Sequence, residues 1–190
     1  LSTPRILPTL KWSLSEEDQG AWRMMTYIDG VSRDAIENAE QAKQVGALLA
    51  RFHHAVSDLD YNFRNARLGV HDTARHIDTL KNSLISYKNH PHFEKIKTLS
   101  EEVLHLVDEL PALPELDDRI VHGDPKISNV IFDSKTDEAI CLIDLDTLTR
   151  MPVILELGDA MRSWCNLSTE DDLSSTFSLK IFRAAVEGYG

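Results

Sequence analysis

The stretch His122–Asn129, with the sequence HGDPKISN, decides how this chain is interpreted, together with the shorter stretch Ile143–Asp146, IDLD. Both stretches follow short runs of apolar and β-branched residues that are typical of strands. Between them, the polar residues 133–138 have the composition of a hairpin tip. The two stretches are therefore predicted to lie where strands end in loops, which is where a rigid scaffold presents side chains to a ligand.

The two stretches carry the side chains that transfer of a phosphoryl group from a nucleotide requires. That reaction needs a carboxylate to orient the attacking hydroxyl, oxygen ligands for magnesium, and a cation near the transferred group. Asp124 is predicted to accept the hydrogen bond of the substrate hydroxyl and to take its proton late in the reaction. Asn129 and Asp144 offer the oxygen atoms that Mg²⁺ prefers. Lys126 supplies the positive charge near the transferred group. From this set of side chains we expect ATP and Mg²⁺ as cofactors and a small hydroxylated molecule as substrate.

The composition argues against several other classes of function. The chain has 190 residues, of which 42% are hydrophobic and 27% charged, which suits a soluble globular protein with a core. A net charge of −11 disfavours nucleic acid as a partner, because binding a polyanion relies on surplus Lys and Arg. No apolar run approaches the roughly 20 residues that cross a bilayer, and the first ten residues lack a signal-peptide pattern. We therefore expect a cytoplasmic protein without membrane contact.

Helical periodicity dominates the rest of the chain, so a mostly helical α+β fold is expected. Ser32 is placed to cap the first predicted helix, and Pro91 suits the first turn of the third. The predicted helices cover residues 32–58, 72–87, 91–110, 155–165 and 175–188, and the predicted strands cover residues 21–28, 119–122, 130–132 and 139–143.

The HGDPKISN loop resembles the catalytic loop of protein-kinase-like phosphotransferases, in the aminoglycoside phosphotransferase and choline kinase branch, which typically shows His-Gly-Asp or His-Asn-Asp. By this resemblance Asp124 corresponds to the catalytic base, and Asn129 and Asp144 correspond to the metal ligands. Lys126 corresponds to a loop lysine that some members carry, and His122 to a residue that braces the loop.

Two further segments carry parts of the same resemblance. Trp22–Gly30 is similar to the last strand of the N-terminal lobe and the hinge of this family, which implies that Met25, Thr26 and Ile28 contact adenine. Leu157–Asp159 resembles a segment that follows the metal loop and supports the site structurally.

Within the family, the chain is most similar to N-acetylhexosamine 1-kinases. This narrower resemblance is carried by Ile143–Thr147, with the sequence IDLDT, and by His71–Thr73, with the sequence HDT. It implies a sugar or amino sugar as the acceptor of the phosphoryl group.

Members of the family also have a small N-terminal lobe with a phosphate-covering loop and a strand lysine paired with a helix glutamate, and none of these can be placed before residue 20. The resemblance therefore implies the C-terminal lobe of a protein-kinase-like fold, with short β hairpins carrying the site and the N-terminal lobe largely absent. Residues 1–30 would be a remnant of the N-lobe strands and the hinge, and residues 31–190 the helical C-lobe with the catalytic and metal-binding loops. Whether these 190 residues catalyse the reaction alone stays open.

Two other classes of function remain as alternatives. The segment Cys141–Thr147 also resembles the haloacid-dehalogenase phosphatase motif, in which Asp144 is a nucleophile and Asp146 an acid/base. That fold needs a parallel sheet built from alternating strands and helices, whereas only a loop and helices are expected after the motif. A kinase-like lobe that binds a ligand without catalysis is the other alternative.

Several other charged or potentially reactive residues are expected to have supporting or structural roles. Asp146 is expected to support the metal site or to contact the metal as well. Arg150 and Arg162 are expected to pair with surplus carboxylates. His53 lies beside a histidine that faces another side of the same helix, so it is not assigned to a metal site. Cys141 and the second cysteine, at position 165, are expected to be reduced packing thiols.

Overall fold

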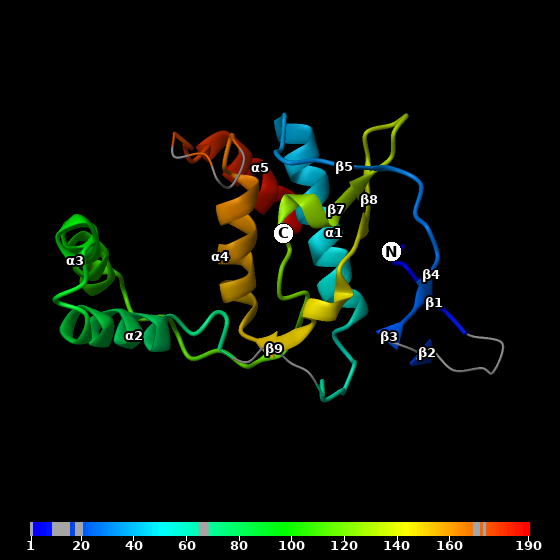
Figure 1. Cartoon of the computed structure of the whole chain (residues 1–190). Coiled ribbons are helices and arrows are strands. Elements are labelled where there is room, and N and C mark those ends of the chain that lie inside the picture. The colour runs from blue at the N-terminus through cyan, green and yellow to red at the C-terminus, as the bar shows by residue number, and fades with distance from the viewer. Residues whose placement is uncertain (1, 9–15, 18–20, 65–68, 169–171, 173) are drawn as a thin grey trace. The chain divides into compact units, whose positions relative to one another are not determined.

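A computed structural model describes residues 2–8, 16–17, 21–64, 69–168, 172 and 174–190 of the chain (Figure 1). Its contacts divide the chain into two compact units. The first combines residues 1–66 with residues 118–190, and the second is formed by residues 67–117. The predicted loop and metal residues belong to the first unit.

The first unit combines three helices with short strands that pair in an antiparallel manner. Pairing joins β1 to β4, β2 to β3, β6 to β9, and β5, β7 and β8 into one three-stranded sheet. The strands are β1 (Ile6–Leu7), β2 (Glu16–Glu17), β3 (Ala21–Trp22), β4 (Met24–Met25), β5 (Val31–Ser32), β6 (Arg119–Val121), β7 (Val130–Phe132), β8 (Ala139–Leu142) and β9 (Thr149–Met151), and the helices are α1 (Ala39–Ala55), α4 (Val153–Trp164) and α5 (Leu179–Tyr189).

The predicted start of the first helix is wrong by seven residues. Ser32 does not cap it but lies in β5, where its hydroxyl donates a hydrogen bond to the Ser128 carbonyl oxygen at 2.7 Å. Helix α1 begins at Ala39, because the Asn38 side chain accepts a hydrogen bond from the backbone nitrogen of Gln41 and caps it there. The apolar residues before Asn38 lie in a segment that is not helical. This segment pairs with β7 and buries Ile36.

The core lies around α1, which packs closely against α5. Gly46 of α1 lies so near α5 that a Cβ atom there would be 2.1 Å from the carbonyl oxygen of Ala185, and Gly188 faces the Lys43 carbonyl in the same way. Leu49 of α1 and Trp164 of α4 are fully buried within this core. The predicted last helix exists, although it begins at Leu179 rather than at residue 175.

The hairpin predicted around residues 133–138 is present and joins β7 to β8. The Asp133 carboxylate accepts hydrogen bonds from the backbone nitrogens of Lys135 and Thr136 at 2.7 and 2.8 Å, as in an Asx turn. These bonds hold the pKa of Asp133 below its usual value. Phe132 is fully buried on β7, so the hairpin is anchored in the core close to the predicted site.

Two strand predictions need correction. The predicted strand over residues 21–28 is split into β3 and β4, which pair with different partners, and residues 26–28 lie outside any strand. The sequence also gave no sign of β9, which pairs with β6 and brings Thr149 opposite Val121. The expectation of only a loop and helices after the IDLD stretch is therefore wrong, but the added strand is antiparallel and does not provide the parallel sheet of the phosphatase alternative.

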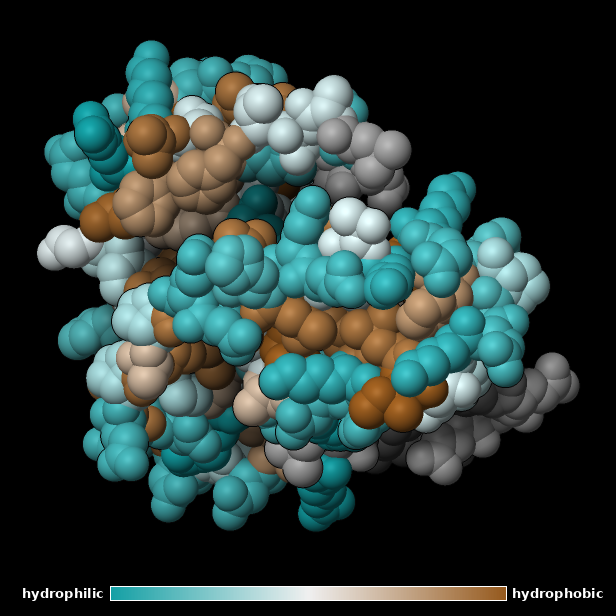
Figure 2. Space-filling model, turned by 90° about the vertical axis from the view of Figure 1, so that its left-hand side faces the viewer, coloured by the Kyte–Doolittle hydropathy of each residue, from teal (hydrophilic) through white to brown (hydrophobic). Residues whose placement is uncertain are grey.

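The second unit contains α2 (Thr73–Ser86) and α3 (Phe93–Glu109), close to the predicted bounds. Asp72 caps α2 through its side chain, whereas Pro91 precedes the first turn of α3 by two residues. An apolar cavity of about 340 Å³ lies between the two helices, and Figure 2 shows a band of apolar residues flanked by hydrophilic ones. Within the described ranges, no helix has the length and apolar character needed to span a bilayer.

Candidate functional site

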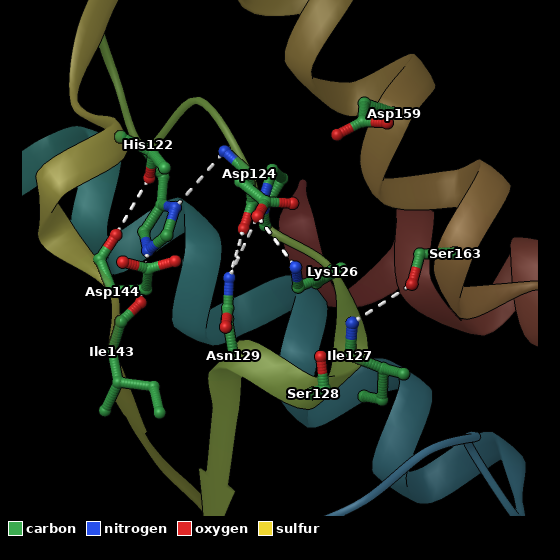
Figure 3. Close-up of polar contacts among 12 residues, drawn as sticks. His122, Asp124, Lys126, Ile127, Ser128, Asn129, Ile143, Asp144, Asp159 and Ser163 are labelled. Carbon is green, nitrogen blue, oxygen red and sulfur yellow. Dashed lines mark hydrogen bonds and ion pairs between the residues drawn. The ribbon is translucent and has the colours of Figure 1, made fainter. Parts of the chain in front are cut away.

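His122 ties the HGDPKISN loop to the end of the strand that precedes Asp144 (Figure 3). Its Nε2 atom lies 2.8 Å from the Ile143 carbonyl oxygen, and its Nδ1 atom accepts from the Asp124 backbone nitrogen at 3.4 Å. The tautomer with its hydrogen on Nε2 satisfies both contacts. The imidazole is fully buried, and this burial lowers its pKa. His122 therefore braces the loop, as the resemblance implies.

Gly123 gives the loop a conformation that other residues rarely adopt. Its φ angle is +84°, and a Cβ atom there would lie 2.2 Å from the Thr147 carbonyl oxygen. The two motif-bearing segments therefore approach each other at backbone contact distance. This close approach sets the direction in which the chain leaves toward Asp124.

Asp124 lies at the centre of a small polar cluster within the loop (Figure 3). Its carboxylate is 3.0 Å from the Lys126 ammonium group, and the Asn129 side-chain nitrogen donates to the Asp124 carbonyl oxygen at 2.9 Å. The same nitrogen lies 3.4 Å from the Asp124 carboxylate. The side chain of Asp124 is 24% exposed and that of Lys126 35%, so solvent or a substrate can reach both.

Helix α4 holds this loop from its other side. Trp164 donates its indole N–H to the Pro125 carbonyl oxygen at 2.7 Å, and the Ile127 backbone nitrogen donates to the Ser163 hydroxyl at 3.1 Å. Trp164 and Ser163 are buried, so these bonds form away from water. The loop is therefore fixed at several points, which is what a catalytic side chain needs for its orientation.

Asp144 has a left-handed backbone conformation, with φ 64° and ψ 49°. This region is unfavourable for most residues but is tolerated by Asp and Asn. The Thr147 hydroxyl donates to the Asp144 carbonyl oxygen at 2.8 Å and helps to hold the turn. Strained backbone of this kind often occurs at functional sites, where the surrounding structure maintains it.

Asp144 lines a cavity of about 380 Å³ together with the residues expected to contact adenine, Met25, Thr26 and Ile28. The structure therefore brings the predicted hinge residues to the same cavity as a predicted metal ligand. The Thr26 backbone N–H already donates to the Arg5 carbonyl oxygen at 2.9 Å. Because this N–H is already used, polar contacts with adenine in this cavity would come from other backbone groups of the segment Met25–Ile28.

Asn129 and Asp144 each carry side-chain oxygen atoms of the kind that magnesium prefers. Asn129 is 6% exposed, and its side-chain nitrogen is used by Asp124, while no hydrogen bond among the described residues uses its side-chain oxygen. A neutral amide oxygen and a carboxylate are hard ligands, and Mg²⁺ is usually held by few protein groups together with water and phosphate oxygens. Across the described part of the chain, no group of three or more His, Cys, Asp or Glu side chains is placed to hold a metal.

A buried polar network behind the loop was missed by the sequence interpretation. Glu156 is fully buried on α4, and one of its oxygens accepts from the Gly123 backbone nitrogen at 2.6 Å. Its other oxygen contacts His53 Nε2, and His53 Nδ1 lies 2.8 Å from the Tyr189 hydroxyl. Burial raises the pKa of Tyr189. Glu156 lies four residues before the buried Ala160, so its helical spacing could have indicated a carboxylate on the core face.

The two arginines expected to pair with carboxylates do so, but the residue that supports the loop differs from the expected ones. Arg162 pairs with Asp159 at 3.1 Å, and Arg150 pairs with Asp60 at 3.5 Å. The segment Leu157–Asp159 was expected to support the site. The hydrogen bond to the loop is instead accepted by Glu156, the residue just before this segment. Asp146 is paired with an arginine, at position 23.

Comparisons with known proteins agree with this geometry. Residues 1–177 match the model of a family described as the phosphotransferase enzyme family. An amicoumacin kinase solved with AMP-PNP and Ca²⁺ has a TM-score of 0.60 and 17% identity, over 100% of this chain and 56% of that chain. An aminoglycoside-3'-phosphotransferase of type VIII has a TM-score of 0.53 and 24% identity, over 99% of this chain and 66% of that chain.

A choline kinase from Cryptosporidium parvum Iowa II has a TM-score of 0.56 and 11% identity, over 98% of this chain and 56% of that chain. The chain thus spans between 56% and 66% of the length of these three structures. The likeness shows a common fold, and the predicted α+β, kinase-like fold class is confirmed.

Proposed function

The chain belongs to the phosphotransferase enzyme family, and from this premise we propose that it transfers a phosphoryl group from ATP to a hydroxyl group of a small molecule. One observation carries the proposal. His122 joins the loop of Asp124 to the carbonyl oxygen next to Asp144, beside the cavity that Asp144 and Ile28 line. The resemblance of the chain to this family is confirmed, while the likeness to N-acetylhexosamine 1-kinases stays a prediction.

In this proposal Asp124 aligns the attacking hydroxyl. A carboxylate of ordinary pKa does not remove a hydroxyl proton in the ground state, so orientation matters more than basicity, and the proton is accepted late in the reaction. The bond from Asn129 to the Asp124 carbonyl oxygen fixes the loop while the carboxylate remains exposed. Lys126, which contacts this carboxylate, places a positive charge beside the reacting groups. Transfer occurs directly, without a phosphorylated enzyme.

Asn129 and Asp144 are proposed to hold Mg²⁺, and the segment of Met25, Thr26 and Ile28 is proposed to contact adenine. When bound, Mg²⁺ neutralises charge that develops on the nucleotide phosphates. The metal assignment is supported by the oxygen atoms that the two side chains offer, and the adenine assignment by the cavity that Asp144 shares with Met25, Thr26 and Ile28. The division of the chain into residues 1–30 and 31–190, and a cytoplasmic location, belong to the same proposal.

The acceptor is proposed to be a sugar or amino sugar. This choice rests on the IDLDT and HDT segments, and structures with the same fold include an aminopropanol kinase and an aminoglycoside phosphotransferase bound to streptomycin. Aminopropanol and streptomycin are small molecules that carry hydroxyl and amino groups. The range of acceptors to be tested therefore includes sugars, amino sugars, choline and amino alcohols.

The test is a screen of the full-length gene product with ATP, MgCl₂ and that range of acceptors, with ADP formation as the readout. We expect one acceptor class to stimulate ADP formation. The Asp124→Asn substitution should slow turnover by about 10²–10⁴-fold and leave nucleotide affinity unchanged. Asp108→Asn, which removes the same charge from an exposed position on α3, is the matched control and should leave turnover unchanged.

Two results would contradict the proposal. Unchanged turnover in the Asp124→Asn variant would remove the role assigned to this carboxylate. Nucleotide binding without transfer to any acceptor would favour the alternative of a kinase-like protein that binds a ligand without catalysis.

A further inference from the structure

Arg23 lies between β3 and β4 and forms a two-pronged contact with Asp146. Its Nη1 atom donates to one carboxylate oxygen of Asp146 at 2.6 Å, and its Nη2 atom contacts the other oxygen. The side chains are 43% and 55% exposed, so this is not a buried structural pair. An exposed ion pair of this kind contributes little to stability.

Both members of the pair line the cavity that Asp144 and Ile28 line. Arg23 is the only cationic side chain among the described residues that line this cavity, whereas Asp144 and Asp146 both carry negative charge there. A nucleotide with its phosphates beside two carboxylates is repelled unless positive charge compensates. A bound Mg²⁺ ion would provide part of this compensation, and Arg23 is positioned to provide more.

The guanidinium group retains the donors for such a contact. Arginine has five N–H groups, and two of them serve the Asp146 carboxylate in the observed pair. The others, including Nε–H, are not used by this pair. Planar guanidinium groups bind phosphate oxygens in two-pronged contacts, as they bind carboxylates.

We propose that Arg23 binds the phosphate chain of the nucleotide in this cavity, and that Asp146 holds its guanidinium group in position. The inference rests on the proposed function, because it assumes that a nucleotide occupies the cavity. It assigns to Arg23 a binding role and to Asp146 a positioning role. Among the described residues that line the cavity, Arg23 is the one whose side chain can place a positive charge beside the phosphates.

The test compares the affinities of adenosine and ADP, measured by calorimetry in MgCl₂ on the 190-residue chain. Arg23→Gln should weaken ADP binding by about 10- to 100-fold, the range expected for one lost charge-assisted contact. Adenosine lacks phosphates, so its affinity should change by less than about twofold, and its binding also shows that the variant is folded. Arg23→Lys keeps the charge without the two-pronged geometry and should give an intermediate ADP affinity.

Two further variants sharpen the test. Arg183→Gln removes the same charge from an exposed position on α5 outside the cavity lining and should leave both affinities unchanged. Asp146→Asn should weaken ADP binding less than Arg23→Gln does, because the guanidinium group remains but is held by one oxygen atom.

The inference is overturned if Arg23→Gln leaves ADP affinity unchanged, or if it weakens adenosine and ADP equally, since an arginine that only shapes the cavity acts on both. A different result marks failure of the proposed function itself. If the unsubstituted chain binds neither adenosine nor ADP, the nucleotide site is absent and the role of Arg23 falls with it.

Discussion

A Glu156 carboxylate oxygen lies 2.6 Å from the backbone nitrogen of Gly123, the residue immediately before Asp124. The carboxylate is fully buried, so the bond forms without competition from water. Through its other oxygen Glu156 contacts His53 of α1, and His53 reaches Tyr189 of α5. The orientation of the HGDPKISN loop is therefore linked to the packing of three helices that themselves carry none of the residues proposed to catalyse the reaction or to bind the metal.

Replacing Glu156 with alanine is expected to lower the free energy of unfolding by about 3–5 kcal/mol. The substitution removes the carboxylate that accepts from the Gly123 N–H and contacts the buried His53 Nε2, and breaking a buried pair is costly because one partner is left uncompensated. Glu156→Gln keeps an acceptor oxygen for Gly123 and should cost less. Urea-induced unfolding measures both variants.

A matched comparison uses the exposed pair of Lys43 and Glu187. Glu187 is 68% exposed, so Glu187→Ala should change the free energy of unfolding by less than about 1 kcal/mol. Equal losses in Glu156→Ala and Glu187→Ala would show that the buried network does not support the loop.

The buried His122 predicts a pH dependence of stability. Burial lowers its pKa in the folded protein below 6.5, so the unfolded chain binds more protons in the pH range between the folded value and about 6.5. Stability is therefore complete above about pH 6.5 and is lost as the pH falls from there toward the folded pKa. The slope from this residue is at most about 1.4 kcal/mol per pH unit.

His122→Gln provides the comparison, because the glutamine amide can still donate to the Ile143 carbonyl oxygen but does not titrate. The difference in slope between the two proteins, measured by urea unfolding from pH 5 to 8, isolates His122 from the other histidines. Identical slopes in the two proteins would mean that His122 is not held neutral by burial.

Close packing of α1 against α5 makes Gly46 intolerant of a larger side chain. A Cβ atom at Gly46 would meet the Ala185 carbonyl oxygen at 2.1 Å, so Gly46→Ala must push the helices apart. Overpacking of this kind costs about 1–3 kcal/mol, which we expect as a loss of unfolding free energy in chemical denaturation.

Gly158 supplies the control for this prediction, because a Cβ atom there meets nothing within 4 Å. It lies in the interior of α4, where alanine is a better helix former than glycine, so Gly158→Ala should raise stability by up to about 1 kcal/mol. If both substitutions stabilise the protein, the approach of the two helices is looser than described.

The sequence predicted the parts of the fold and site that depend on local chemistry. Helical periodicity located the five helices, and the polar run at residues 133–138 located the hairpin. The spacing of Asp124 and Asn129 was sufficient to predict that one loop brings them together, and the structure places their polar groups within 3.4 Å. Local pattern is informative in these cases because each feature depends on neighbouring residues.

The features that were missed depend on contacts between distant parts of the chain. Ser32 was predicted to cap a helix, because apolar residues follow it at helical spacing, but pairing with β7 places it in a strand. Thr149–Met151 is too short to be distinguished from a loop until β6 pairs with it. Glu156 received no role from the sequence, because its partners, Gly123 and the histidine at position 53, are far away in sequence.

Calorimetric titration of the chain with ADP measures whether Asp144 helps to hold Mg²⁺ with a nucleotide in the cavity. Asp144→Asn is a clean variant, because asparagine also tolerates the left-handed backbone found there. We predict that binding requires Mg²⁺, is lost with excess EDTA, and weakens at least about tenfold in Asp144→Asn. Equal ADP affinities with and without Mg²⁺, or in the variant and the unsubstituted chain, would show that Asp144 does not hold Mg²⁺ with the nucleotide.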